Sequence, residues 1–323
     1  MRGSGDDPAV DHGALAALLA EQSGVVARRQ LLGLGCRPHD IERLIRRRAL
    51  TPVHAGVYVE HTGELRWHQR AWSAVLALWP AALWGESALH DETDELGGDT
   101  PVHVAVERQR RLVAPPGLRV HRVVRFDERV LWNRSPPRVR YEDAVLEVAS
   151  RAGSDFAAFA VLAEGCRTRR TTASRLADTL AARPRVRRRA WLSGVLADLT
   201  AGSTSVLEHG YVTRVQRAHG LPRAAQQVRS TSSVGVVYRD VEYSGVLVVE
   251  LDGRLVHNTA AQRDADFERD LDAALDGRAT VRLSWGQVID RPCTTASKIS
   301  QLLQRHGWSG RPHSWSPGCR LTR

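Results

Sequence analysis

The sequence has almost no lysine and no long apolar run. Of its 46 lysine and arginine residues only Lys298 is a lysine, so nearly every positive charge is a guanidinium. No stretch approaches the roughly 20 apolar residues that a membrane-spanning helix needs. The short run ALAALLA follows Asp6, Asp7 and Asp11, whereas a signal peptide begins with positive charge. The sequence therefore predicts neither membrane insertion nor secretion.

Cysteine is also sparse. Cys36, Cys166, Cys293 and Cys319 are scattered along the chain without a C-x-x-C pair. This spacing argues against a zinc site and against a disulfide framework. A reducing cytoplasm is the compartment that fits such cysteines best.

The length of the chain limits the number of domains, and its charge indicates the class of partner. At 323 residues with 42% hydrophobic content, the chain can form two or three domains with real cores. A formal net charge of +10 and a pI near 10.4 indicate a polyanionic partner. Nucleic acid, above all double-stranded DNA, is the leading partner class, so we expect a cytoplasmic, nucleoid-associated protein.

Residues 1–12 are predicted to be disordered, and residues 13–60 to form a winged helix-turn-helix. Three helical patterns, ALAALLAEQSG, VVARRQLLGLG and RPHDIERLIRRRAL, precede a hairpin pattern, TPVHAGVYVEH. In the third helix Ile41, Leu44 and Ile45 form an apolar stripe. The rest of that helix is basic, as in a DNA-recognition helix, and its predicted DNA contacts are Arg43, Arg46, Arg47 and Arg48. The alternative is a small helical subdomain with a solvated basic face.

The segment GVVARRQLLGLGCRPHDIERLIRRRALTPVHAGVYV resembles the N-terminal winged-helix domain of AbiEi-type antitoxins. The resemblance rests on the apolar helix, the basic helix and the closing GVY strand. It implies DNA binding and makes a toxin protein a candidate partner, as in type IV toxin–antitoxin systems. The stretches ESALH, PVHVAVERQRR and GLRVHR resemble the middle segment of the same proteins.

The middle of the chain is predicted to be mixed α/β over residues 61–150 and helical over residues 151–200. Helical spacing predicts that four tryptophans pack into a core: Trp67, Trp72, Trp79 and Trp84. His103 and His121 are interpreted as strand-surface residues. The helical region carries arginine clusters at 167–170 and 183–189, which are either solvated faces or surfaces that follow phosphate charge.

The stretch VVELDG places two carboxylates on one strand face, because side chains alternate across a strand and Glu250 and Asp252 are two residues apart. A two-residue hairpin loop would put Asp240, on the preceding strand, on the opposite face. A three-residue loop pairing Glu242 with Val246 would bring Asp240 and Glu250 together as diagonal neighbours. The same register is favoured because it gathers an apolar set on the other face: Val241, Tyr243, Leu247, Val249 and Leu251.

Asp240 and Glu250 have the chemistry to bind Mg²⁺ or Mn²⁺, since such ions take one or two carboxylates and keep several waters. A divalent ion can promote phosphodiester hydrolysis by polarising the phosphoryl group and generating hydroxide. An acid on a helix, an Asp on a strand and a Glu on the next strand resemble the PD-(D/E)XK nucleases. More narrowly, SVLEHGY, GLPRAAQQV, YRDVEY, VVELDGRLVHN and RDADFERDLDAAL resemble the Vsr-related endonuclease-like domain across residues 203–305.

This resemblance implies a catalytic set of Glu208, Asp240, Glu250, Asp252 and His257, with Asp240 and Glu250 as metal ligands. Glu208 would be the helix acid, although its position after Ser205 also fits a capping box. Asp252 stands where the motif has its lysine. His257, as a general base, or one of three arginines would have to compensate: Arg254, Arg263 and Arg269.

The sequence thus predicts an α/β protein of the α+β kind, ending in an endonuclease-like mixed sheet flanked by helices over residues 201–310 and a tail over residues 311–323. The predicted function is a DNA-binding protein with a Mg²⁺-dependent endonuclease domain. The alternative is a catalytically inactive DNA-binding regulator or antitoxin, which the missing lysine favours. RNA stays open as a substrate because its phosphate chemistry is the same.

Overall fold

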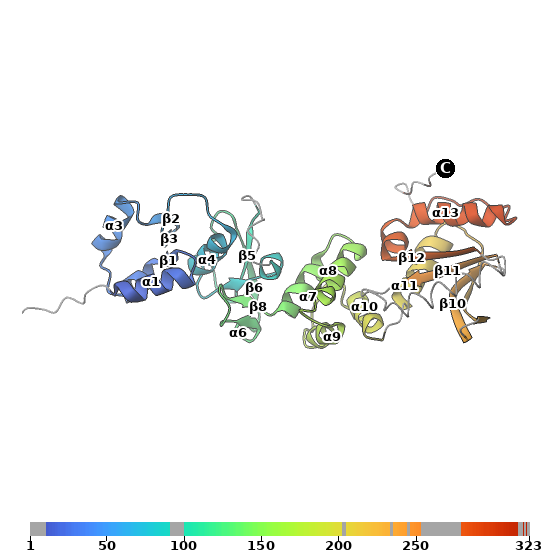
Figure 1. Cartoon of the computed structure of the whole chain (residues 1–323), viewed down its shortest axis with the longest axis horizontal. Coiled ribbons are helices and arrows are strands. Elements are labelled where there is room, and N and C mark those ends of the chain that lie inside the picture. The colour runs from blue at the N-terminus through green and yellow to red at the C-terminus, as the bar shows by residue number, and fades with distance from the viewer. Residues whose placement is uncertain are drawn as a thin grey trace, which may run out of the picture. The chain divides into compact units, whose positions relative to one another are not determined.

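The chain divides into two compact units, Met1–Glu147 and Val148–Arg323 (Figure 1). The computed structural model describes residues 11–90, 100–201, 205–232, 235–243, 246–252, 279–315, 319 and 321. Helices and strands occur in both units, which confirms the predicted α+β class. Within these ranges no helix is long and apolar enough to cross a bilayer.

The first unit begins with helices around a three-stranded sheet of order β1-β3-β2. Its elements are α1 (His12–Glu21), β1 (Val25–Ala27), α2 (Arg28–Gly33), α3 (Pro38–Arg46), β2 (Thr51–His54) and β3 (Val57–Val59). This is the order predicted for a winged helix-turn-helix, with one correction. Val25–Ala27, predicted as the start of the second helix, is a fully buried strand paired with β3. Two adjacent β-branched valines pack better on a pleated sheet than in a helix.

Helix α3 and the turn after it expose the basic residues that the sequence singled out. Ile41 is buried, and Leu44 and Ile45 pack against the same core cluster, so the opposite face of the helix meets solvent. The helix ends at Arg46, earlier than predicted. The backbone then turns through a left-handed residue, Arg48, with φ 58°.

The remainder of the first unit is built on a five-stranded sheet of order β6-β5-β4-β8-β7. Its elements are α4 (Trp67–Ala77), β4 (Ala82–Leu83), α5 (Glu86–Leu89), β5 (Val102–Glu107), β6 (Leu118–Val123), α6 (Phe126–Arg129), β7 (Val130–Leu131) and β8 (Arg138–Val139). Helix α7 (Tyr141–Arg151) follows and spans the boundary between the units.

The predicted aromatic core of this region is confirmed for three tryptophans and wrong for the fourth. Trp67, Trp72 and Trp84 are buried, whereas Trp79 is 41% exposed and meets Trp132 edge-on. Trp79 lies beyond the end of α4, so helical spacing no longer sets its direction. His103 and His121 are half-buried with stacked rings whose centroids lie 5.1 Å apart, so they are not simple surface residues.

The second unit opens with three helices where helical patterns were predicted: α8 (Asp155–Arg167), α9 (Ala173–Ala181) and α10 (Arg189–Ala201). Ser154 and Thr172 cap the first two, their hydroxyls accepting hydrogen bonds from Ala157 N and Arg175 N.

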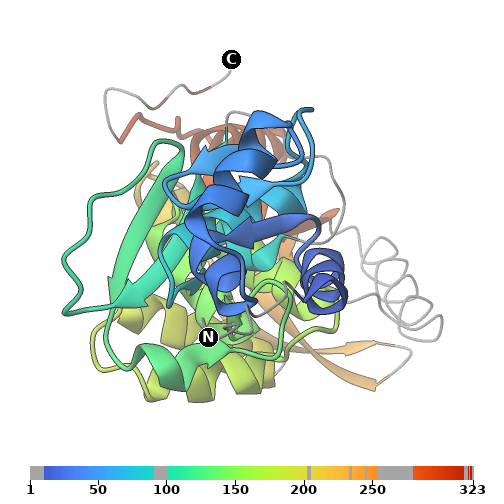
Figure 2. The ribbon, with the colours of Figure 1, turned by 90° about the vertical axis from the view of Figure 1, so that its left-hand side faces the viewer.

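A four-stranded mixed sheet of order β12-β11-β10-β9 forms the rest of this unit. Its elements are α11 (Ser205–Gly210), the π-helical η1 (Tyr211–Arg217), β9 (Ala225–Ser232), β10 (Gly235–Tyr243), β11 (Leu247–Asp252), β12 (Ala279–Ser284), the π-helical η2 (Gly286–Asp290) and α13 (Pro292–Arg305). Strands β11 and β12 are parallel and the other pairs antiparallel. The outer parts of β9 and β10 continue as a two-stranded ribbon (Figure 2).

Helix η1 packs against one face of this sheet. The hydroxyl groups of Tyr211 on η1 and Tyr243 on β10 are 2.9 Å apart, and both side chains are buried. Burial raises the pKa of Tyr243 to about 12 and that of Tyr211 well above its ordinary value. Gly210 allows the close approach of η2, because a Cβ there would lie 2.7 Å from Ile289 Cδ1.

Candidate functional site

The hairpin of β10 and β11 places Asp240 and Glu250 on one face of the sheet. Glu242 pairs with Val248 and Val241 with Val249, where the paired register ends. Continued by one residue, this register sets Asp240 across from Glu250, and there the Leu251 N–H donates to Asp240 Oδ2. The predicted pairing of Glu242 with Val246 was wrong by two residues. A shift of two leaves every side chain on its predicted face, and the two acids become direct rather than diagonal neighbours.

The opposite face is the apolar one that the register argument required. Its members are all buried: Val241, Tyr243, Leu247, Val249 and Leu251. The acidic face is more open, since Asp240 and Glu250 are half-buried and Asp252 is exposed. The carboxylates therefore lie on the side of the sheet opposite to the one that η1 covers.

A hydrogen bond fixes the carboxylate of Asp240. Its Oδ2 accepts the backbone N–H of Leu251 at 2.7 Å, next to Glu250 on β11. The bond orients the side chain across the strand pair just beyond Val241 and Val249, where the pairing of β10 with β11 ends. A carboxylate has about four lone-pair sites, so this contact leaves acceptor capacity for a cation.

Strand β12 adds a cation to this face that the sequence analysis did not select. In the parallel register Arg282 is the partner of Glu250, and Ser284 is the partner of Asp252. Paired residues of neighbouring strands project to the same side of a sheet, so the exposed Arg282 stands beside the acids. The alternation Thr280, Arg282, Ser284 against buried Leu283 was the available signal, but using it required knowing that β12 pairs with β11.

Glu208 lies on α11 and is half-buried. The N–H of Val206 donates to Asp198 Oδ2 at 2.6 Å, a bond that ties the start of α11 to α10. His257 and the three arginines proposed to replace the motif lysine, Arg254, Arg263 and Arg269, lie outside the described residues.

The arginines predicted to contact DNA are all exposed, but they differ in setting. Arg43 and Arg46 lie on α3, whereas Arg47 and Arg48 lie in the turn after it, which corrects their predicted place on the helix. Arg43 Nη2 donates to Asp40 Oδ1 at 2.8 Å, so part of its charge is compensated.

The arginine cluster at 183–189 is partly structural. Arg183 is buried, and Arg188 pairs with Asp155 at 3.3 Å. Arg189 donates to Leu180 O at 2.6 Å, near the end of α9. Asp155 also pairs with Arg214 of η1 at 2.5 Å. In this cluster only Arg185 and Arg187 are exposed and so suited to follow phosphate charge.

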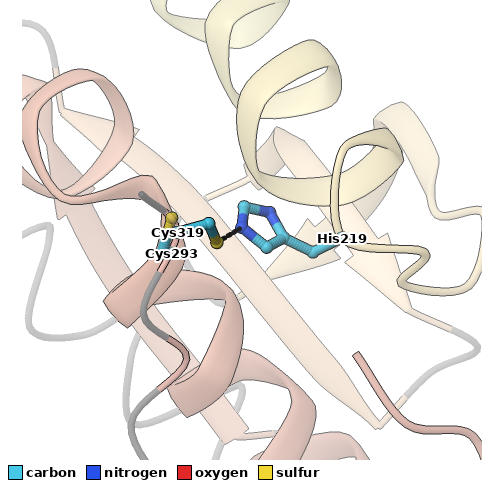
Figure 3. A group of neighbouring side chains, drawn as sticks. All are labelled: His219, Cys293 and Cys319. Carbon is cyan, nitrogen blue, oxygen red and sulfur yellow. Dashed lines mark hydrogen bonds between the residues drawn. The ribbon is translucent and has the colours of Figure 1, made fainter. Parts of the chain in front are cut away.

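The structure brings together a second group of metal-ligand side chains that the sequence did not predict. His219, Cys293 and Cys319 come from the turn after η1, the first turn of α13 and the tail, and their ligand atoms lie within 4.8 Å of one another (Figure 3). The expectation that the cysteines form no zinc site rested on the absence of C-x-x-C. His219 and Cys319 are 100 residues apart in sequence, so spacing gave no signal.

No protein-family profile matches this chain, and no curated protein matches it. Among solved structures, the RV2827C protein from Mycobacterium tuberculosis is similar at 20% identity and a TM-score of 0.37, over 60% of this chain and 78% of that one. A TM-score this low does not establish a shared fold, so this similarity carries no conclusion about activity.

Proposed function

We propose that the second unit is a metal-dependent nuclease domain of the PD-(D/E)XK type, related to Vsr-like endonucleases, in a DNA-binding protein. The observation that carries the proposal is the placement of Asp240 and Glu250 across from each other on the face of the sheet away from η1. Two hard oxygen donors at this position fit Mg²⁺ or Mn²⁺. When bound, such an ion polarises a phosphodiester and activates water for its hydrolysis.

The neighbouring residues have definable roles in this proposal. Asp240 and Glu250 hold the cation, and the Leu251 N–H keeps the Asp240 carboxylate turned toward β11. Arg282, in register with Glu250, supplies positive charge near the phosphate, a role that Asp252 cannot fill. Glu208 and His257 remain proposed as helix acid and general base.

The test is cleavage of supercoiled, linear and mismatched DNA, and of single-stranded RNA, by the full-length protein with Mg²⁺ or Mn²⁺ and then with EDTA. We expect DNA cleavage that EDTA stops, and loss of cleavage in Asp240→Asn and Glu250→Gln with DNA affinity kept or improved. Asp290→Asn is the matched control, because Asp290 is an exposed acid of the same unit and pairs with Arg291. Cleavage that survives both carboxylate variants would refute the proposed site.

Arg282→Gln separates the proposed charge-stabilising role from metal binding. We expect slower cleavage, by about 10²–10³-fold if Arg282 stabilises transition-state charge. The concentration of Mg²⁺ that gives half-maximal rate should be little changed. A large rise in that concentration with an unchanged maximal rate would instead assign Arg282 to shaping the metal site.

We further propose that the basic face at α3 binds DNA. Arg46, Arg47 and Arg48 are exposed, and phosphate contacts by such residues add affinity that falls with salt. Replacing Arg46 and Arg47 together by Ala should flatten the slope of log affinity against log salt by about one unit per lost contact. Arg43→Ala should have a smaller effect because Asp40 already compensates that charge. An unchanged slope in the double variant would contradict this proposal, and Arg119→Ala, which removes an exposed arginine of β6 outside the basic clusters, is the control.

A regulator or antitoxin is the second candidate function, and Asp252 at the position of the motif lysine favours it. In that case Asp240 would serve the fold through its bond to Leu251 and no cleavage would occur. Salt-sensitive DNA binding by the wild-type protein without cleavage in Mg²⁺ or Mn²⁺ would support this candidate. A co-purifying toxin protein would then be the expected partner.

A further inference from the structure

Cys319 in the tail of the chain lies beside His219 and Cys293. This group offers imidazole and thiol donors, whereas the acidic face offers carboxylates. We propose that His219, Cys293 and Cys319 bind a Zn²⁺ ion that fastens this tail to η1 and α13. This proposal does not depend on the nuclease proposal, because it uses different residues and a different class of metal.

The spacing of the three donors suits zinc. Zn–S bonds of about 2.3 Å and a Zn–N bond of about 2.0 Å in a tetrahedron set the donor atoms about 3.5–3.8 Å apart. His219 Nε2 and Cys319 Sγ are 3.3 Å apart, and all three donor atoms lie within 4.8 Å of one another. Small side-chain movements would bring this set to the geometry of a bound ion.

The histidine is already oriented as a ligand. His219 is fully buried, and its Nδ1 lies 3.1 Å from Val215 O, so Nδ1 donates its proton there and Nε2 faces the sulfurs with its lone pair. Metal-binding histidines are typically held in this way by a backbone carbonyl or a carboxylate. The sulfur and imidazole donors select a borderline-soft ion such as Zn²⁺ over Mg²⁺.

The tail residues around Cys319 are also arranged about this group. His313 N donates to His219 O at 3.1 Å, and Ser314 Oγ donates to Cys319 O at 3.2 Å. Gly220 has φ +66°, and a Cβ there would lie 2.5 Å from the ring of His313. His313 therefore lies against the turn that carries His219, and it is our candidate for the fourth ligand once its side chain rotates toward the three donors.

The proposed ion would join three segments that are distant in sequence. Cys293 is in the first turn of α13, and α13 packs against η1 and η2. Binding Zn²⁺ by two thiols releases two protons and adds two metal–sulfur bonds, so the tail is fixed without a disulfide. The same two sulfurs could instead form a disulfide by losing two hydrogens to an oxidant, and the experiment must separate these outcomes.

The experiment measures metal in the full-length protein, purified without a histidine tag and under reducing conditions. Elemental analysis should find about one zinc per chain, and Cys293→Ser and Cys319→Ser should each lose most of it. Cys166→Ser is the matched control, because Cys166 is a half-buried thiol on α8 outside the group. Asp240→Asn should keep its zinc, which separates this site from the proposed magnesium site.

A measurement on the unaltered protein covers variants that fail to fold. After exchange of zinc for Co²⁺, thiolate-to-cobalt charge-transfer absorption should appear with the intensity of two thiolates. Zinc removal should increase hydrogen exchange in peptides covering residues 306–315. The proposal is overturned if reduced protein neither contains nor takes up zinc, if Cys166→Ser loses as much metal as the other variants, or if intact mass shows a Cys293–Cys319 disulfide in protein kept under reducing conditions.

Discussion

The Tyr211–Tyr243 contact offers a sharp test of how η1 is held against the sheet. Replacing Tyr243 by Phe removes one hydroxyl and leaves the other buried without its partner, because Tyr211 is 0% exposed and the oxygen–oxygen distance is 2.9 Å. An orphaned buried hydroxyl costs about 1–3 kcal/mol, more than the roughly 1 kcal/mol that a typical hydrogen bond contributes. Tyr211→Phe should cost a similar amount, because Tyr243 is only 2% exposed.

The double variant is the informative one. With both hydroxyl groups gone, no polar atom of the pair is left unsatisfied, so Tyr211→Phe with Tyr243→Phe should destabilise the unit by clearly less than the sum of the single changes. The chain has two compact units, so a single unfolding transition cannot be assumed. Hydrogen exchange of amides in η1 and β10 measures the opening free energy locally. Additive effects, or single variants that cost less than about 0.5 kcal/mol, would refute the reasoning.

Three further predictions concern stability. The buried tyrosines have pKa values raised above the usual value of about 10. The stability that the neutral pair contributes is therefore fully present below about pH 10 and is lost as pH rises through about 12 for Tyr243. Alkaline denaturation followed by tyrosinate absorbance should be steep in the wild type and flatter in the double Phe variant. Arg110→Met should raise hydrogen exchange at the end of α4 by an amount equivalent to about 1–3 kcal/mol, because Arg110 donates at 2.6–3.1 Å to three carbonyl oxygens there; Arg119→Met, which alters an exposed arginine of β6 in the same unit, should leave this segment unchanged. Asp155→Asn should destabilise the second unit by about 1–2 kcal/mol through its two arginine partners, and the loss should shrink at high salt; a salt-independent loss would mean that the pairs are not its cause.

The sequence predicted the parts of the fold that local periodicity controls. The apolar stripe of α3 and the alternation along β10 and β11 each predict which side chains face inward. In the structure these apolar side chains are buried or pack against the core. Periodicity did not separate helix from strand at Val25–Ala27, because a short run of buried residues is apolar all round in either form. Nor could it place Trp79, which lies beyond the end of its helix.

The candidate sites divide in the same way. The shared face of Asp240 and Glu250 follows from the parity of one hairpin loop, which is local information. The position of Arg282 depends on which strand pairs with β11, and the meeting of His219 with Cys319 depends on how the tail returns across the unit. Such long-range contacts leave no pattern in a single sequence. The role of the basic clusters was equally hidden, since Arg183, Arg188 and Arg189 belong to the fold rather than to a binding surface.

The loop between β10 and β11 limits how this domain can vary in length. Three residues separate the paired Tyr243 and Leu247. An insertion or deletion of one residue would turn β11 over, taking Glu250 into the apolar layer and Val249 out of it, unless the strand pairing broke. A change of two residues keeps every side chain in its layer. Tolerance to length changes at this hairpin should therefore alternate between even and odd, and a library of loop insertions scored for folding would reveal that alternation.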